Sequence, residues 1–288
     1  MQSRRGFLAA SGTLSTVAVA GCSGILGGDD DGGSDGVSAG GRYTDLVAET
    51  DERPVRVNLQ RINELAANEN FAGVGQDQSF LGLDPSEAEY AVNVTEGTAG
   101  LQANIYSIVF GPFVFEDVRS ELEAQVGELS EGEETNGFRT LEGESGSQAI
   151  YYGVGDEAFV FGTDQTLFET GTRLVAGDES TLFDSNEDMG TLAGIIGDPT
   201  LGQVQLEPEQ LQTDPTGNAV AGAAGIELGD EESDYTSGVT YETEAEATEN
   251  ESGVGDAVVE TESAIDSVET AVDGRTVIVT ATATTSEL

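Results

Sequence analysis

Cys22 is the only thiol in the chain, and its type and position favour one covalent reaction. It follows the small residues Ala20 and Gly21, a setting typical of a lipoprotein cleavage site that leaves the cysteine at a new N-terminus. The chemistry there is formation of a thioether between the sulfur and a lipid. With no second cysteine, an intrachain disulfide is excluded. We therefore predict that Cys22 is lipidated.

The residues before Cys22 have the pattern of an export signal. Arg4 and Arg5 are followed by Phe7 and Leu8, and then by a stretch of small and apolar residues that also contains serines and threonines. That stretch is too short for a transmembrane helix, which needs about 20 predominantly apolar residues. We predict that residues 1–22 are a twin-arginine signal with a lipobox, which the twin-arginine translocase uses to export the folded protein.

Residue types that usually carry catalysis are missing. The chain has neither His nor Lys, which excludes an imidazole general base, imidazole metal ligands and a Schiff-base amine. The run Gly143-Glu144-Ser145-Gly146 lacks the Gly-x-Ser-x-Gly spacing of a serine hydrolase and indicates a surface loop. Close carboxylates such as Glu131 and Glu133 are expected by chance among 55 acids. We predict no catalytic residue, no metal site and no cofactor, and hence a protein that is not an enzyme.

The acidic composition limits both the solvent and the partners. Ten arginines face 55 acids, and removal of residues 1–21, which hold Arg4 and Arg5 and no acid, leaves a formal net charge of −47. Such repulsion opposes a compact state, but in molar salt the Debye length falls to about 3 Å and neighbouring carboxylates are screened. The composition therefore suits concentrated salt. It argues against a nucleic-acid partner, because phosphate binding needs a basic surface.

These features together resemble a known class of proteins. The lysine-free acidic composition, the Ser-Arg-Arg-Gly-Phe-Leu signal at residues 3–8 and the Ala-Gly-Cys lipobox are similar to the twin-arginine-exported lipoproteins of haloarchaea. That resemblance implies a lipid anchor in the extracytoplasmic face of the cell membrane. More weakly, the body resembles haloarchaeal lipoprotein domains of unknown function, through Gly111-Pro112-Phe113 and Tyr151-Tyr152-Gly153. That family supplies no catalytic residues.

The remaining chain divides into a tether and a folded body. Residues 23–41 are rich in Gly, Ser and Asp with little apolar surface to bury, which predicts a disordered acidic tether. We expect a first α+β unit at residues 42–197 and a second at 198–288. Both have the same order of strands and helices, which indicates a diverged internal repeat. The expected class is α+β, with two related units of mostly antiparallel sheet and helices packed on one face.

Hydrophobic periodicity places the elements of both units. In the first, we expect strands at 55–59, 90–94, 101–110, 148–154 and 158–161, and helices at 115–129, at 164–176 and from a Ser185/Asp188 capping box to 196. In the second, we expect strands at 202–206, 218–228, 235–247, 267–271 and 275–284, and a helix at 255–264. The turn Val272-Asp273-Gly274-Arg275 predicts a hairpin.

A few residues in the body are candidates for binding or modification. Arg53, Arg56 and Arg61 either contact an anion or pair with Asp51, Glu52 and Glu64, and pairing is the favoured interpretation. Adjacent strand residues point to opposite faces, so at most one of Tyr151 and Tyr152 lines a ligand cleft. The sequons at Asn93 and Asn250 are possible N-glycosylation sites, and Asn250 is favoured because its surroundings indicate an acidic loop.

Three functions are compatible with these sequence features. The favoured one is a membrane-anchored extracytoplasmic lipoprotein, a non-enzymatic binding or envelope-associated surface protein with an unknown protein or small-molecule partner. The second is the solute-binding subunit of a transporter, although the body lacks parallel βαβ patterning and has no Trp to stack on a substrate. The third is a surface hydrolase that uses carboxylates, which needs a pocket of converging acidic groups.

Overall fold

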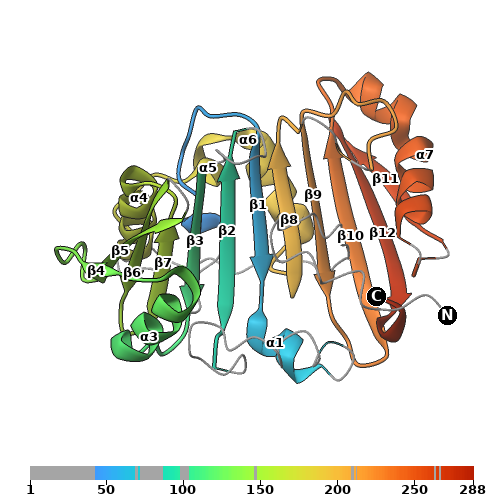
Figure 1. Cartoon of the computed structure of the whole chain (residues 1–288). Helices are drawn as coiled ribbons and strands as arrows, with labels where there is room; N and C mark the ends of the chain where they lie inside the picture. Colours follow the sequence, from blue (N-terminus) through green and yellow to red (C-terminus); the bar gives the residue numbers. More distant parts are fainter. Residues whose placement is uncertain are drawn as a thin grey trace, which may run out of the picture.

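The computed structural model describes residues 43–68, 71, 87–97, 104–145, 148–208, 211, 213–262, 264, 265 and 267–288. Within these residues the chain forms a 12-stranded sheet with helices on both faces (Figure 1). The strand order is β11-β12-β10-β9-β8-β1-β2-β3-β7-β6-β5-β4, and every neighbouring pair is antiparallel. This confirms the α+β class with an antiparallel sheet.

The strands are β1 (Val55–Gln60), β2 (Tyr90–Glu96), β3 (Asn104–Phe110), β4 (Ser130–Glu131), β5 (Arg139–Ser145), β6 (Gln148–Val154), β7 (Ala158–Gly162), β8 (Leu201–Leu206), β9 (Ala221–Glu227), β10 (Glu232–Thr240), β11 (Glu269–Asp273) and β12 (Thr276–Thr284). The helices are α1 (Ile62–Ala67), α3 (Phe115–Val126), α4 (Gln165–Ala176), α5 (Leu182–Ser185), α6 (Glu187–Ile196) and α7 (Glu244–Thr261), with 3-10 turns η2 (Tyr43–Leu46) and η3 (Thr285–Glu287).

The sheet contains one strand order twice. In the first half, β1, β2 and β3 run side by side, α3 follows, and the hairpin β6-β7 returns so that β7 lies beside β3. In the second half, β8, β9 and β10 run side by side, α7 follows, and the hairpin β11-β12 returns so that β12 lies beside β10. The two first strands, β1 and β8, pair antiparallel. The halves are therefore related by an approximate two-fold rotation about an axis through this central pair.

The two faces of the sheet are covered differently. On one, the α6 face, α4 lies over β3, β6 and β7, and α6 lies over β8, β9 and β10. A continuous apolar core fills this layer and includes Val57, Val92 and Val204 from the central strands. On the opposite α7 face, α3 covers one end of the sheet and α7 covers the other (Figure 1). Helices thus lie on both faces of the shared sheet rather than on one.

Local sequence sets the helix ends. In α3, Phe115, Val118 and Leu122 form one buried stripe. The helix stops at Val126 rather than at the expected residue 129, because Gly127 takes a positive φ of 96°. At the start of α4, the Asp164 side chain accepts a hydrogen bond from the backbone N–H of Leu167, a standard N-cap contact.

Two expected helix starts were wrong. The Asn186 side chain caps α6 by accepting from the Met189 backbone N–H at 3.0 Å, whereas Ser185 ends the preceding helix α5. Residues 244–247 were expected in a strand but begin α7. There the Thr243 hydroxyl accepts from the Glu246 backbone N–H, and the Glu246 carboxylate accepts from the Thr243 backbone N–H. This capping box starts the helix eleven residues before the expected residue 255.

Two strands were missed, the short β4 and its partner β5. The run Gly143-Glu144-Ser145, expected in a surface loop, belongs to β5, which pairs with β6 along its length. The Val272 to Arg275 turn does join β11 and β12 as a hairpin, and Gly274 adopts the positive φ that this turn needs. No helix among the described residues is both long and apolar enough to span a membrane.

Candidate binding face

The middle of the α7 face carries polar side chains from four adjacent strands. In β1, Val55, Val57 and Leu59 point into the α6-face core, so the alternate residues point to the α7 face. The strand register aligns Arg56 with Thr95 and Gln205, and Asn58 with Asn93 and Gln203. Ser107 lies beyond Asn93 on β3. We call this group the polar floor: Arg56, Asn58, Asn93, Thr95, Ser107, Gln203 and Gln205.

Hydrogen bonds hold the amides of the polar floor in place. The Ser107 hydroxyl donates to Asn93 Oδ1 at 2.7 Å, and Gln203 Nε2 donates to Asn58 Oδ1 at 2.6 Å. Gln205 Nε2 donates in turn to Gln203 Oε1. Gln203 and Gln205 are each only 7% exposed. These contacts fix the amide orientations, since each bond uses an amide oxygen as acceptor.

Arg56 differs from the other arginines that the structure describes. Six of those seven pair with a carboxylate within 4 Å, whereas Arg56 has no such partner among the described residues. Its Nε is buried and makes no hydrogen bond to them. With Thr95 and Gln205 it lines a small depression, together with Pro54, Val55, Gly97 and Pro208. An unpaired guanidinium is unexpected in a chain with 55 acids.

Carboxylates near the two ends of β1 pair with other arginines. Beside the depression, Arg53 Nε lies 3.3 Å from Glu207 Oε1. At the other end, Arg61 Nη1 donates to Glu64 Oε1 at 2.9 Å and its Nη2 donates to Asp198. These partners raise the pKa of Arg61, although burial acts in the opposite direction. The prediction that these arginines pair with carboxylates is therefore correct for Arg53 and Arg61 and, within the described part of the chain, wrong for Arg56. Of the partners, only Glu64 was expected, whereas Glu207 and Asp198 are distant in sequence.

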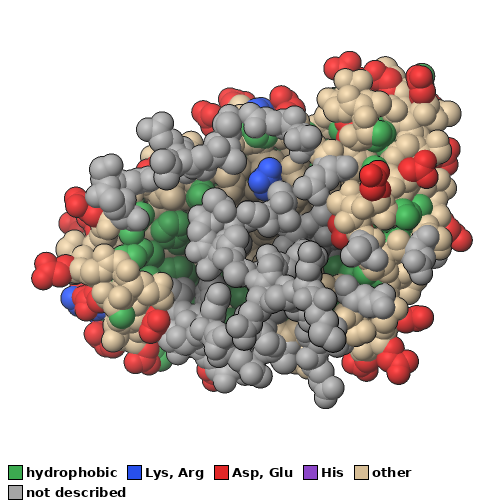
Figure 2. Space-filling view, turned by 45° about the vertical axis from the view of Figure 1, so that its right-hand side comes forward, with side chains coloured by type: hydrophobic (Ala, Val, Ile, Leu, Met, Phe, Trp, Pro, Cys, Tyr) green, Lys and Arg blue, Asp and Glu red, His purple; other side chains and the backbone are tan. Residues whose placement is uncertain are grey.

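The polar floor contains no acidic residue. The neighbouring strand positions are also uncharged. Ile105 lies opposite Thr95 on β3, and Gly222 and Ala224 lie opposite Gln205 and Gln203 on β9. Acidic side chains lie over α7 and over the ends of the molecule among the described residues in the space-filling view (Figure 2). Glu96, at the end of β2, alternates with Thr95 and so points to the α6 face. Burial raises its pKa, and a hydrogen bond from Thr50 partly offsets that effect.

The described acidic and tyrosine side chains with a shifted pKa lie outside the polar floor. The described residues contain no group of three or more His, Cys, Asp or Glu side chains placed to hold a metal ion. Burial raises the pKa of the Tyr90 hydroxyl far above its usual value, which keeps it a neutral phenol. Glu262, at the end of α7, has a pKa raised to about 7 by burial, but it lies outside the polar floor.

The other candidate residues are dispersed. Arg4, Arg5, Phe7, Leu8 and Cys22 lie outside the described residues, as does the tether at 23–41. Asn93 belongs to the polar floor and is partly buried.

Asn250 lies within α7, not in a loop, and its Nδ2 donates to the Glu246 carbonyl at 2.9 Å. The expectation that Asn250 lies in an acidic loop, which favoured its sequon over that of Asn93, is therefore wrong. Tyr152 is buried against α3's layer, and Tyr151 packs against Phe168 on the α6 face.

The polar floor was not predicted as a unit from the sequence. The alternation of apolar and polar residues in β1 and β2 indicates only that one face of each strand is not part of an apolar core. The floor arises from the pairing of β1 with β8, two strands that are far apart in the sequence. A signal was present in Gln203 and Gln205, two long amides that alternate with apolar residues in an expected strand.

Comparisons with known proteins bear on the fold. No family model matches this chain, and no curated protein matches it either. The solved structure of crystal form III of TP0453 is similar, with 10% sequence identity and a TM-score of 0.51, over 85% of this chain and 95% of that chain. Crystal form IV of the same protein has 10% identity and a TM-score of 0.48, over 88% and 94%. At this identity the first likeness shows a shared fold alone.

Proposed function

We propose that this protein is a lipid-anchored, extracytoplasmic surface protein that binds a partner without catalysing a reaction. The sequence signals at Arg4, Arg5 and Cys22 support export and anchoring, and residues 23–41 would separate the folded body from the membrane. The acidic, lysine-free composition supports a haloarchaeal source and function in concentrated salt. In this proposal the sheet is the binding scaffold.

The observation that carries the binding role is the polar floor. A sheet face outside the apolar core of such an acidic chain would be expected to carry carboxylates, as strands β10 and β11 do at Glu232 and Glu269. The central strands instead present amides, hydroxyls and one arginine, and hydrogen bonds between the side chains hold the amides in fixed orientations. Preorganised polar groups on a rigid sheet lower the entropic cost of binding a partner.

The alternatives receive less support from the architecture. A solute-binding subunit is expected to have two lobes with parallel sheets and a cleft between them, whereas these strands form one antiparallel sheet. A carboxylate-dependent hydrolase needs converging acids, and the polar floor has none. Both remain outcomes that the experiments below can detect.

The anchoring part is tested by export and fractionation in the native cell. Replacing Arg4 and Arg5 by Lys-Lys should retain the precursor in the cytoplasm. Replacing Cys22 by Ser should leave the signal uncleaved or release the protein from the membrane. Normal export of the first variant, or unchanged membrane association of the second, would overturn this part.

The binding part is tested by affinity purification of the lipidated protein from its own membranes in molar salt, with mass spectrometry of co-purifying proteins and small molecules. Asn93→Val removes a floor amide at a strand position. Thr282→Val makes a matched change at an exposed position on β12, outside the floor. A partner lost from the Asn93 variant and kept by the Thr282 variant supports the proposal. A partner that both variants retain contradicts a role for the floor.

A further inference from the structure

The polar floor has more hydrogen-bond donors available than acceptors. The amide oxygens of Asn58, Asn93 and Gln203 each accept a bond from a neighbouring side chain. Among the described residues, no partner occupies the Nδ2 groups of Asn58 and Asn93. With three amide oxygens used internally and N–H donors of Asn58, Asn93 and Arg56 left without a partner among the described residues, the floor is suited to a ligand that accepts hydrogen bonds.

Arg56 supplies the positive charge for such a ligand. Its neighbours directly across the strands are the Thr95 hydroxyl on β2 and the Gln205 amide on β8, and all three line the same depression. The Gln205 side chain is held by its bond to Gln203. A guanidinium presents two parallel N–H groups, which match the two oxygens of a carboxylate or a phosphate. Its buried Nε has no hydrogen-bond partner within the described part of the chain, and that costs free energy unless a ligand or water supplies an acceptor.

We propose that Arg56, Thr95 and Gln205 form a binding site for an oxyanion, the carboxylate or phosphate group of a small ligand. This inference rests on the proposed binding function and names the chemical class that the floor recognises. Arg56 forms the charged contact, Thr95 adds a hydroxyl donor, and the Asn58 and Asn93 amides extend the site with neutral donors along the next row. The polar floor itself carries no acid, and the nearby Glu207 pairs with Arg53 rather than with Arg56.

The net charge of the chain makes this site dependent on salt. A body with a formal charge of −47 repels anions over long distances in dilute buffer. In molar salt the Debye length is about 3 Å, so the repulsion is screened while short hydrogen bonds to Arg56 persist. We therefore expect the oxyanion to bind in concentrated salt.

The test is titration of the full-length protein with acetate, with inorganic phosphate and with neutral glycerol, in molar potassium chloride, by calorimetry. Arg56→Gln is compared with Arg173→Gln, which makes the same charge change at an arginine that pairs with Glu179. Loss of a charge-assisted contact should weaken binding of the oxyanion about tenfold or more in the Arg56 variant. The Arg173 variant should bind as the wild type does, and glycerol should not bind. Preference for acetate or for phosphate identifies which of the two groups the site takes.

Three results would overturn the oxyanion site. These are equal binding by the Arg56→Gln variant, no oxyanion binding by the wild type, and binding only after chloride is removed, which would mark an adventitious halide contact. Thermal unfolding of each variant separates loss of the site from loss of the fold. If a partner from native membranes depends on Asn93 and not on Arg56, the proposed binding function survives and the oxyanion site does not.

Discussion

The α7 face of the sheet is built differently in its middle and at its two ends. At the ends, strand residues such as Phe159 and Val279 are apolar and are buried under α3 and α7. In the middle, the same face carries the amides and hydroxyls of the polar floor. The hydrogen-bonded sheet is continuous through both zones, so sheet geometry does not explain the change. The side chains on one face change from core residues to hydrogen-bonding residues where β1 pairs with β8.

This contrast assigns stability to the apolar ends of the α7 face and binding to its polar middle. The central strands already bury Val57, Val92 and Val204 on the α6 face, and that layer anchors them without help from the polar floor. The two end helices each bury an apolar stripe on the α7 face. Substitutions at the ends should therefore lower the free energy of unfolding, whereas substitutions in the middle should mainly change binding.

The largest effect is expected at α3. Leu122 is 4% exposed and packs in the apolar layer between α3 and the sheet, so Leu122→Ala should lower the free energy of unfolding by about 2–4 kcal/mol. Asn93→Ala in the polar floor should lower it by about 1 kcal/mol or less, because it loses one partly buried hydrogen bond. Chemical unfolding in molar salt, followed by circular dichroism, measures both.

Gln125→Ala is the control for α3, since Gln125 is exposed and its side chain donates a hydrogen bond to the neighbouring Glu121 on the same helix. Its effect should stay within about 0.5 kcal/mol. Equal losses from Leu122→Ala and Asn93→Ala would mean that the middle of the face is as important for folding as its ends.

The second effect concerns the α7 end. The buried Tyr241 hydroxyl donates to Asp214 Oδ1 at 3.0 Å, and the backbone N–H groups of Thr216 and Ala219 donate to the same carboxylate. Burial alone would raise the pKa of Asp214, but these hydrogen bonds lower it overall. Tyr241→Phe should lower the free energy of unfolding by about 1.5–2 kcal/mol, as expected for a hydrogen bond to a charged group.

Tyr235→Phe is the matched control, because the Tyr235 hydroxyl makes only a long contact of 3.4 Å to Ser237. It should cost about 0.5 kcal/mol. Losses of the same size in both variants would show that the Asp214 contact adds nothing specific to the α7 end.

The third effect is a dependence on pH at the end of α7. Burial raises the pKa of Glu262 from 4.5 to about 7, so between these values the folded state holds a proton that the unfolded chain releases. Stability from this group is present below about pH 4.5 and is lost as the pH rises through about 7. The free energy of unfolding of the wild type should therefore fall as the pH rises, and Glu262→Gln should make this fall about 1–2 kcal/mol smaller. This value is lower than the full pKa shift would give, because Glu262 is partly exposed to solvent.

The measurement is unfolding in concentrated salt at about pH 5 and about pH 8, where the two protonation states dominate. Glu260→Gln is the control, since Glu260 is exposed on the same helix. If the free energy of unfolding changes with pH equally in the wild type and in the Glu262→Gln variant, the proposed effect of the buried Glu262 carboxyl is wrong.

Single strands were more predictable from sequence than the pairing between them. The strands β1, β2, β6, β7 and β8 and the hairpin β11-β12 were expected nearly as they occur, because each follows a local pattern of alternation or a turn residue. The start of α7 was missed because Glu244 to Ala247 alternates like a strand. The capping box at Thr243 and Glu246 outweighs that pattern.

The middle of the sheet depends on contacts that local patterns do not contain. Arg56 has acidic neighbours in sequence, Asp51 and Glu52, which favoured ion pairing. In the fold, its strand neighbours are Thr95 and Gln205, and the nearby acid Glu207 pairs with Arg53 instead. The register of two antiparallel pairings decides which side chains meet, and that register is set by the whole sheet.

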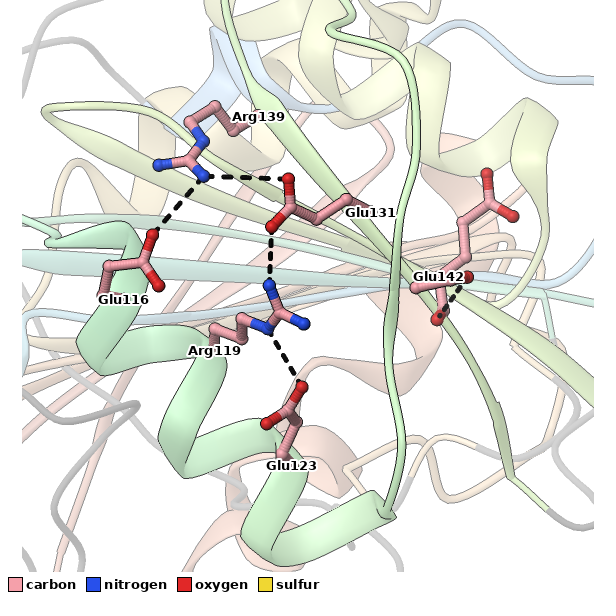
Figure 3. A network of polar contacts seen from close by, with 7 residues as sticks. Glu116, Arg119, Glu123, Glu131, Arg139 and Glu142 are labelled. Atoms are coloured by element: carbon pink, nitrogen blue, oxygen red, sulfur yellow. Dashed lines mark hydrogen bonds and ion pairs between the residues drawn. The ribbon is translucent and has the colours of Figure 1, made fainter.

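The smallest effect distinguishes how the two end helices are attached. Whereas α7 begins with a capping box and buries valines, α3 is also tied to β4 and β5 by a network of ion pairs (Figure 3). In that network Arg139 lies 3.5 Å from Glu116 and 3.9 Å from Glu131, and all three side chains are about half exposed or more. Its guanidinium carbon also lies 3.3 Å from the centre of the Phe115 ring.

Exposed ion pairs contribute little and are screened by salt, whereas a guanidinium stacked on a ring keeps its contact in molar salt. We expect Arg139→Gln to lower the free energy of unfolding by about 0.5–1 kcal/mol, by the same amount in moderate and in concentrated salt. Arg139→Lys retains the charge but not the planar stack, so it should lose nearly as much. If Arg139→Lys matches the wild type, and the loss in Arg139→Gln shrinks as salt increases, the ion pairs rather than the stack hold α3 to the sheet.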